Sequence, residues 1–467
     1  MGIATESERT QEVGMSEVHE ALEVAHRSAL DWLDSLSERE IPGRASVEEV
    51  AAVLGELPDG PQPAADVVER LVAAVEPGLT AMPSGRWYGM VIGGTHPAAL
   101  AADWLTSAWD QNSALRAATP GTVAVETVVD RWLLDLLGLP ADAGVGLVTG
   151  ATMSNWTCLV AARDAVLRRA DWDVASRGLA GSPGVRVLVG DERHDSVDSA
   201  LRFAGLGRPE PVASDDQGRI DVEALEWNLG HDAGRPTIVV LQAGNVHSGA
   251  FDDFASAIEV AHGAGAWVHV DGAFGLFAAA SPTLRHLVAG YASADSWTTD
   301  AHKTLNVPYD CGIAIVADDA ALRASMGMRG EYLIQDAGGG DPFDRVPEMS
   351  RRARAVPLWA ALAALGRRGV ADLVERYCRH ARMFAEGIRR LPGGEVLNDV
   401  VFTQVCASFG SDDRTRDVVR RMLAEGTAWT SGSRWHDRAV LRVALCNWST
   451  TDADVETTLA ALRRATA

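Results

Sequence analysis

The sequence predicts an α/β fold built on a mostly parallel sheet. Between about residues 120 and 320, short apolar runs alternate with helical patterns, and each run ends in glycine or a polar turn. The runs are VGLVTG, VRVLVG, TIVVLQAG, WVHVDGAFG and CGIAIV. Because these strands are apolar on both faces, helices should cover the sheet on both sides. The polar residues that follow the strands would then meet at one edge, where such sheets bind ligands.

Helical patterns flank this central region on both sides. Residues 16–39 carry apolar residues at helical spacing, so the chain opens with amphipathic helices that need a partner surface. Beyond Pro357, a long helical region leads to the strand-like runs VCASFG and VLRVALCNW and to a closing helix. The expected parts are an N-terminal helical segment over residues 1–85, a large α/β domain over residues 86–355 and a small C-terminal α+β domain over residues 356–467.

Composition and charge narrow the class of protein. The 467 residues include 42 lysine and arginine residues in total and 64 aspartate and glutamate residues, which gives a formal net charge of −22. Such acidity argues against binding to nucleic acid or to an anionic membrane, since both attract basic patches. Five scattered cysteines without a C-x-x-C pair favour reduced thiols over disulfides or a metal site. Without a signal-peptide pattern or a run of about 18 apolar residues, we expect a cytoplasmic protein.

Two motifs at strand-to-helix turns contain candidate binding residues. In VTGATMSN, the strand is expected to continue through Ala151 and Thr152 into a helix that begins near Ser154. Free N–H groups at such a helix start, with a threonine hydroxyl, can hold a phosphate, although strand-to-helix turns need small residues in any case. In VGDERHDSVDSALRF, His194 follows a strand and precedes a helix. A histidine there is either a helix cap or core residue, or a catalytic imidazole.

Two further motifs place charged residues at strand ends. AWVHVDGAFG puts Asp271 at the mouth of an apolar strand, where a carboxylate is costly unless it meets a cation; the alternative is a helix cap reached through a tight turn. DSWTTDAHKTLNVPYDCG puts His302 beside Lys303, for which the alternative is a solvent-facing lysine. Together the four motifs supply a phosphate cradle, a flat aromatic ring, a carboxylate and an amine. Pyridoxal 5′-phosphate needs that set for its phosphate, ring, pyridine nitrogen and aldehyde.

The sequence resembles the group II family of pyridoxal-phosphate-dependent decarboxylases, which includes aromatic L-amino-acid, glutamate and histidine decarboxylases. The similar motifs occur in family order from about residue 60 to the end and are YGMVIGG, TSAWDQNS, TGATMSN, HVDGAFG, TTDAHKTLNVPYDCG, SRRARAVPLWAALAALGRRG and LRVALCNWSTT. The resemblance implies a fold-type I PLP-dependent transferase fold with a mostly parallel, seven-stranded sheet. It also implies an amino-acid substrate, pyridoxal 5′-phosphate as cofactor, and a homodimer with sites at the subunit boundary.

Residue by residue, the resemblance assigns a cofactor site. Lys303 would form the Schiff base with the cofactor, Asp271 would pair with the pyridine nitrogen, and the His194 imidazole would stack on the ring. Schiff-base chemistry then implies a lowered pKa for the Lys303 amine. The other residues assigned to the cofactor are Ala273 against the second ring face, Ala151, Thr152 and His302 around the phosphate, and Asn245 and Asp300.

The sequence departs from the family's pattern where a proton is supplied to Cα. In aromatic decarboxylases of this family a tyrosine on a mobile loop donates it, whereas here Pro342 or Phe343 falls at about that position and Tyr332 lies upstream. In plant relatives, phenylalanine in place of that tyrosine accompanies oxidative aldehyde formation. An aldehyde synthase, an aldolase-type lyase or an aminotransferase is therefore the alternative outcome. His247 either replaces the missing donor or is a polar loop residue.

Aromatic and apolar residues precede the first motif of the expected site. The approach includes Trp87, Tyr88, Val91 and Ile92. Such side chains at a binding site favour an aromatic or large apolar substrate over glutamate. Because most tryptophans lie in cores or interfaces, these residues have that alternative role. The expected reaction is decarboxylation of an L-amino acid with an aromatic or large apolar side chain.

Overall fold

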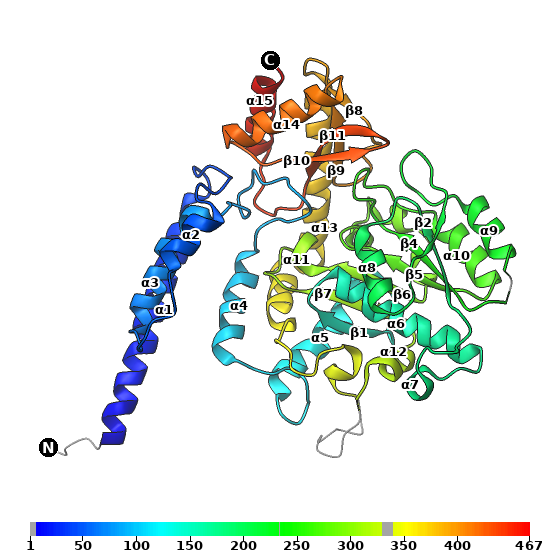
Figure 1. Ribbon diagram of the computed structural model, residues 1–467, viewed down its shortest axis with the longest axis horizontal. Coiled ribbons are helices and arrows are strands. Elements are labelled where there is room, and N and C mark those ends of the chain that lie inside the picture. The colour runs from blue at the N-terminus through cyan, green and yellow to red at the C-terminus, as the bar shows by residue number, and fades with distance from the viewer. Residues whose placement is uncertain (1–5, 233, 329–339) are drawn as a thin grey trace.

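A seven-stranded sheet in the order β1-β7-β6-β5-β4-β2-β3 forms the centre of the computed structural model, which describes residues 6–232, 234–328 and 340–467 (Figure 1). Strands β3, β2, β4, β5 and β6 pair in parallel, and β7 pairs antiparallel with both β6 and β1. The strands are β1 (Gly144–Val148), β2 (Arg186–Gly190), β3 (Glu210–Val212), β4 (Thr237–Gln242), β5 (Trp267–Asp271), β6 (Ser296–Asp300) and β7 (Gly312–Val316). The prediction of an α/β fold with a mostly parallel sheet is confirmed.

Helices cover both faces of this sheet, as its apolar strands require. Alternate residues of β2 and β4 enter two separate cores, one shared with α6, α8 and α12 and the other with α5, α9, α10 and α13. These helices are α5 (Pro120–Leu137), α6 (Ala151–Arg169), α8 (Asp195–Phe203), α9 (Val222–Gly230), α10 (Phe254–Gly263), α12 (Asp319–Met326) and α13 (Ala355–Arg389). Shorter or peripheral elements around them are α4 (Pro97–Trp109), α7 (Val174–Arg177), α11 (Ala301–Thr304), η2 (Leu276–Ala280), η3 (Arg285–Val288), η4 (Tyr291–Ser293) and η5 (Pro342–Arg345).

Two strands of the sheet, β3 and β6, were not among the predicted apolar runs. Strand β3 has only three residues and contains Pro211, which suits an edge strand. Strand β6 reads SWTTD and is buried along its whole length. Two of its hydroxyl groups find partners inside the protein: Ser296 bonds to Trp267 and His269, and Thr298 donates to the Cys158 sulfur. Hydroxyl groups therefore replace apolar groups in a central strand, which a search for apolar runs does not detect.

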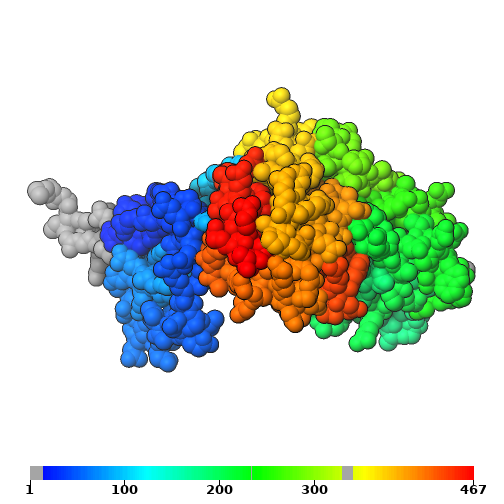
Figure 2. Space-filling model, turned by 90° about the horizontal axis from the view of Figure 1, so that it is seen from above, coloured from blue at the N-terminus to red at the C-terminus, as the bar shows by residue number. Residues whose placement is uncertain are grey.

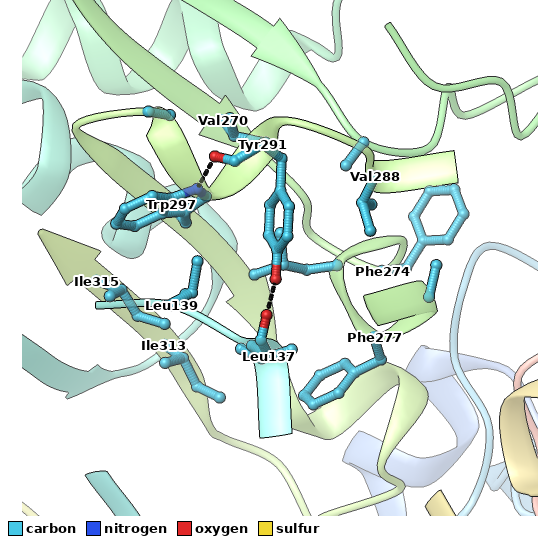
Figure 3. Close-up of a cluster of buried hydrophobic side chains, with 14 of the residues drawn as sticks. Leu137, Leu139, Val270, Phe274, Phe277, Val288, Tyr291, Trp297, Ile313 and Ile315 are labelled. Carbon is cyan, nitrogen blue, oxygen red and sulfur yellow. Dashed lines mark hydrogen bonds between the residues drawn. The ribbon is translucent and has the colours of Figure 1, made fainter. Parts of the chain in front are cut away.

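Trp297 anchors β6 in the core on the α5 side of the sheet (Figure 3). Its indole Nε1 donates to the carbonyl oxygen of Tyr291 at 2.9 Å, and the Tyr291 hydroxyl in turn donates to the carbonyl oxygen of Leu137 at the end of α5. On β7, Ile315 is the register partner of Trp297, and Ile313 belongs to the same cluster two residues along the strand. This cluster ties β6 and β7 to α5, and β6 leads into α11, which carries the candidate lysine.

A smaller antiparallel sheet in the order β10-β11-β9-β8 lies beyond α13. Its strands are β8 (Glu395–Val396), β9 (Gln404–Ser408), β10 (Ser431–Trp435) and β11 (Arg438–Ala444), and α14 (Asp412–Glu425) and α15 (Asp452–Thr466) pack on it. Helix α13 contacts the cores of both sheets and breaks its helical path at Gly366, where φ is 60°. An α+β unit at the C-terminal end was predicted, whereas its boundary at residue 356 stays a prediction.

The N-terminal helices form an arm along one side of the molecule, where His26 of α1 contacts Trp104 of α4 (Figures 1 and 2). The arm consists of α1 (Glu6–Ser35), α2 (Val47–Leu54) and α3 (Ala64–Val75), followed by η1 (Glu76–Gly78). Several apolar side chains of α1 remain exposed, with Val18 at 49%, Leu22 at 59% and Leu30 at 46%. The arm thus carries an apolar surface that the described part of the chain leaves uncovered. Within the described ranges, no helix has the length and apolarity needed to cross a membrane.

Replacing Trp297 by alanine tests how much the buried cluster around Trp297, Tyr291 and Leu137 contributes to stability. The side chain is fully buried and loses both its packing and its bond to Tyr291, so Trp297→Ala should lower the free energy of unfolding by about 3–5 kcal/mol. The exposed Trp227 on α9 provides a matched control, and Trp227→Ala should change it by no more than about 0.5 kcal/mol. Urea unfolding followed by circular dichroism measures both. Equal midpoints for the two variants would contradict the assignment.

Candidate active site

A cavity of about 560 Å³ opens at the carboxyl ends of the parallel strands. It is walled by the start of α6, the loops after β2 and β4, the end of β5, and α11 after β6. Its lining includes most of the residues that the sequence predicted for the cofactor, namely Ala151, Thr152, His194, Asp271, Ala273, Asp300, His302 and Lys303, and also Val91 and Ile92. The fold therefore brings these distant positions into one site.

The start of α6 forms one end of the cavity. Gly150 is the N-cap and Ala151 is the first helical residue, so the prediction that the helix begins near Ser154 is wrong. Gly150 connects β1 to this helix with an extended backbone. A Cβ at this position would lie 3.2 Å from the His302 ring, so a side chain larger than that of glycine would crowd the ring. The first-turn N–H groups have no partners within the helix. With the Thr152 hydroxyl they form a site suited to an anion such as phosphate.

His194 is both a helix cap and part of the cavity wall. It is the N-cap of α8, and its Nδ1 accepts a hydrogen bond from the backbone N–H of Ser196 at 3.1 Å. The two alternatives raised by the sequence are therefore compatible. The cap fixes the imidazole, which can then offer a flat surface to a ring in the cavity.

Asp271 is a buried carboxylate without a cationic partner among the described residues. Its Oδ1 accepts from the backbone N–H of Ala273 at 3.1 Å, and its Oδ2 accepts from the Asn155 side-chain amide at 3.0 Å. The tight-turn bond that the sequence allowed is present, but it caps no helix. An ionised carboxylate in such a place is costly unless a cation meets it. A protonated pyridine nitrogen would satisfy this requirement.

Lys303 forms an ion pair with Asp300 inside the cavity. The Nζ atom lies 2.9 Å from Oδ2 of Asp300, which ends β6 and is the N-cap of α11. Burial lowers the pKa of the Lys303 amine, but the Asp300 carboxylate outweighs it, so the pKa lies above its usual value. The prediction of a lowered pKa is wrong in this structure, because Asp300 was not foreseen as its partner. The same carboxylate can accept the proton that the amine must lose before it attacks an aldehyde.

His302 lies between the lysine and the anion site. Its Nδ1 accepts from the backbone N–H of Cys311 at 3.1 Å, and its Nε2 faces Asp300 at 3.5 Å. Burial lowers the pKa of the His302 imidazole. In the neutral form with Nδ1 accepting, Nε2 carries the proton. The ring thus presents a donor, and it is held from the other side by Tyr309, whose ring centroid lies 4.4 Å away.

The structure contradicts the predicted contact of Trp87 and Tyr88 with substrate. Trp87 is 1% exposed and stacks on Trp429, and Tyr88 is fully buried edge-on against Phe384. Neither side chain lines the cavity. Their aromatic surface is used to attach this segment to the smaller sheet. The residues that follow them reach the cavity instead.

The predictions for Asn245 and His247 are also wrong. The Asn245 side chain is buried away from the cavity and accepts from the backbone N–H groups of His247 and Ser248, so its amide stabilises the turn after β4. His247 does not line the cavity either; its Nε2 bonds to Ser433 Oγ at 2.9 Å. Burial first, and then the nearby Arg442, lower its pKa to about 4. At neutral pH His247 is therefore uncharged and a poor proton donor.

Pro342 and Phe343, which the sequence placed at the tyrosine position of the family's mobile loop, lie in a short helical turn away from the cavity. Pro342 and Phe343 form part of η5 and are buried, and the backbone N–H of Phe343 bonds to the carbonyl oxygen of Ala114. They are buried and do not line the cavity, so a phenol at these positions would not reach it. Tyr332 lies outside the described residues.

The sequence assigned no role to several residues that line the cavity, among them Tyr309 and Arg442. Tyr309 lies within the lysine motif and faces the cavity from the loop before β7. Arg442, on β11 of the smaller sheet, lines the opposite wall; it has no ion-pair partner among the described residues, and its Nε is buried without a hydrogen bond. A half-buried guanidinium of this kind is suited to a carboxylate. The available signal was a lone arginine within the apolar run VLRVALCNW.

A further signal lay in the composition. Lys303 is the only lysine in the sequence, and every other residue in the combined count of lysine and arginine is an arginine. Arginine can replace lysine in most surface ion pairs, whereas a guanidinium cannot form a Schiff base as a primary amine does. The single lysine is therefore found where its particular chemistry would be needed.

Comparison with known sequences agrees with this site. Residues 49–409 match the sequence model described as the pyridoxal-dependent decarboxylase conserved domain. Tryptophan decarboxylase 1 of Oryza sativa subsp. japonica is 28% identical over 414 residues, which cover 81% of this chain and 79% of that protein. The aromatic-L-amino-acid decarboxylase of Rattus norvegicus is 26% identical over 453 residues, which cover 91% of this chain and 92% of that protein.

Comparison with solved structures gives the same result for the whole fold. The crystal structure of Oryza sativa TDC with PLP and tryptamine has a TM-score of 0.89 at 25% sequence identity, and the match covers 97% of this chain and 98% of that chain. The family model spans more than half of the chain, and the cofactor is pyridoxal phosphate. Since the cavity also offers an anion site, an amine and an unpaired carboxylate that fit this cofactor, the chain belongs to the pyridoxal-dependent decarboxylase family.

Proposed function

We propose that the chain removes the α-carboxyl group of an aromatic L-amino acid in the cavity around Lys303, with pyridoxal 5′-phosphate bound covalently to that lysine. The observation that carries the proposal is the position of the chain's single lysine beside Asp300, in the same cavity as the unpaired carboxylate of Asp271. An amine, a proton acceptor for it and a counter-ion for a pyridine nitrogen are the groups that such catalysis needs.

The cofactor end of the cavity follows from the contacts already described. When bound, pyridoxal phosphate supplies the electron sink for cleavage of the bond to the carboxylate. The first turn of α6 and the Nε2–H of His302 would hold its phosphate, and Asp271 would keep the proton on its pyridine nitrogen. His194 would cover one face of the ring and Ala273 the other. Asp300 would take the proton from Lys303 Nζ.

The substrate end of the cavity favours an aromatic side chain. Val91, Ile92 and Phe274 contribute apolar wall, and Arg442 faces them from the smaller sheet. Among the described lining residues, Arg442 and Lys303 are the only arginine and lysine. With Lys303 engaged by the cofactor, Arg442 can orient the α-carboxylate, and no second such cation is left for an acidic side chain. Relatives named as tryptophan and aromatic-amino-acid decarboxylases agree with this preference.

We propose further that the protein is a cytoplasmic homodimer. Trp104, Leu105 and Trp109 on α4 are 42%, 48% and 50% exposed, and a mostly apolar cavity of about 590 Å³ lies between this helix and α1. Exposed apolar surface of this kind supports an interface, here with a second copy of the chain. All five cysteines are free and buried, which supports a reducing compartment.

The covalent attachment can be tested by intact mass. Borohydride reduction of the yellow holoenzyme should add one cofactor per chain, and peptide mapping should place it on Lys303, because the chain offers no other lysine. Lys303→Ala should lose both the added mass and the visible absorption of the covalent form. As a fold control, its circular dichroism should match wild type. Reduction that adds no mass to the wild-type holoenzyme would contradict the proposal.

The reaction and its substrate can be tested together. Wild-type enzyme given aromatic amino acids and glutamate should release carbon dioxide and amine in equal amounts from the aromatic ones, without ammonia or peroxide. Arg442→Met should raise KM by about 10–100-fold, because it removes a charged hydrogen bond worth about 1.5–3 kcal/mol. Arg434→Met is the control, since Arg434 lies on the adjacent strand and is 60% exposed. Aldehyde and peroxide from the wild type would instead indicate an oxidative outcome.

The dimer proposal predicts the effect of charge on α4. Trp104→Glu combined with Trp109→Glu should shift the sedimentation profile from dimer to monomer, because a carboxylate would be buried without a partner in the interface. Trp227→Glu alters a tryptophan on α9 that is 63% exposed, and it should leave the profile unchanged. An active wild-type monomer would refute the proposal.

A further inference from the structure

A chain of buried hydrogen bonds leads away from Asp271 into the interior of the large sheet. Asn155 on α6 contacts Asp271 through its amide nitrogen, and its Oδ1 lies 2.8 Å from His269 Nε2. His269 Nδ1 lies 3.0 Å from Ser296 Oγ, which accepts from Trp267 Nε1 at 2.9 Å. The intermediate residues Asn155, His269 and Ser296 are all fully buried. Solvent therefore does not compete for these bonds.

The strand pattern WVHVD produces this arrangement. Trp267, His269 and Asp271 alternate with Val268 and Val270, so the polar side chains share the face of β5 that α6 covers. On the neighbouring parallel strand, Ser296 is the register partner of His269. The chain of bonds thus depends on one strand register and on one turn of α6.

The direction of every donor in the chain can be assigned. An indole Nε1–H only donates, and an ionised carboxylate only accepts. Ser296 Oγ accepts from Trp267, which leaves its own proton for His269 Nδ1. Burial lowers the pKa of His269 to about 4, so the ring is neutral and carries its one proton on Nε2. That proton is donated to Asn155 Oδ1, and the Asn155 amide donates to Asp271.

We infer that Asn155 and His269 are positioning residues for the reaction: with Ser296 and Trp267 they form a one-way hydrogen-bond chain that keeps Asp271 ionised and oriented toward the pyridine nitrogen. The inference rests on the role proposed above for Asp271. Each donor polarises the next, and a buried bond of this kind is stronger than the same bond in water. The chain therefore stabilises the negative charge that Asp271 needs in order to hold a protonated ring nitrogen.

The protonation state of that nitrogen provides the test. Holoenzyme reconstituted with pyridoxal phosphate carrying ¹⁵N in its ring should give the NMR signal of a protonated nitrogen in the wild type. Asn155→Leu and His269→Phe should move the signal toward the unprotonated position, whereas His269→Gln, which keeps a donor facing Asn155, should restore it. By analogy with outer-shell partners of metal ligands, Asn155→Leu should lower kcat by about 10–100-fold and leave KM nearly unchanged.

Two controls separate this role from a purely structural one. Thr157→Val removes a buried hydroxyl on the same helix that donates to the carbonyl oxygen of Met153, and it should leave the ¹⁵N signal in place. Ser296→Ala removes a single oxygen and should cause a smaller shift in the same direction as Asn155→Leu. It replaces the larger substitutions if these prevent folding, which thermal unfolding of each variant would reveal.

Asp271→Asn separates this inference from the function on which it rests. If Asp271→Asn moves the ¹⁵N signal while Asn155→Leu, His269→Phe and Ser296→Ala leave it at the wild-type position, the hydrogen-bond chain has no role and the inference is overturned. If Asp271→Asn also leaves the signal unchanged, the proposed role of Asp271 fails as well. A graded shift from Ser296→Ala to Asn155→Leu to Asp271→Asn would support the inference.

Discussion

The common direction of β2, β4, β5 and β6 is the constraint on which the site depends. Because these strands are parallel, their carboxyl ends lie at one edge, and His194, Asp271 and Lys303 meet there although they are far apart in sequence. The antiparallel β7 closes this edge: a Cβ on Gly312 would lie 2.5 Å from the backbone of Gly150. His302 accepts from the backbone N–H of Cys311, next to Gly312, and this bond holds its ring near the start of α6.

Two buried carboxylates in this cavity have different surroundings, and the difference assigns them different chemistry. Asp300 pairs with a lysine, so its charge is already balanced and the pair can exchange a proton. Asp271 receives hydrogen bonds from Asn155 and from the backbone but meets no cation among the described residues. The protein thus preserves a negative charge that needs an external partner, and a protonated heterocycle is the partner that the rest of the cavity can accommodate.

Site residues could be predicted from the sequence where their position follows from the local pattern. The predictions were wrong or missing where tertiary contacts determine whether a side chain reaches the cavity. Asp271 and Lys303 could be predicted because Asp271 ends a strand and Lys303 follows one. The ends of these parallel strands lie at one edge of the sheet, so both side chains reach the cavity there. Trp87 was misassigned because an aromatic residue can fill a core or bind a ligand, and only packing distinguishes the two. Asn245 was misassigned because its amide stabilises a turn. Arg442 was missed because it enters the cavity from a different sheet.

The misassigned aromatic residues nevertheless shape the cavity through the backbone. Tyr88 N–H bonds to the carbonyl oxygen of Trp429 at 2.9 Å, and the backbone N–H of Ala444 on β11 bonds to the carbonyl oxygen of Tyr88 at 3.0 Å. The segment that leads to Val91 and Ile92 is thereby fixed to the strand that carries Arg442. A displacement of the smaller sheet would therefore move the apolar wall and the guanidinium together. The large sheet carries the cofactor side of the cavity. The segment with Val91 and Ile92, together with strand β11, determines the space and the positive charge available to the substrate.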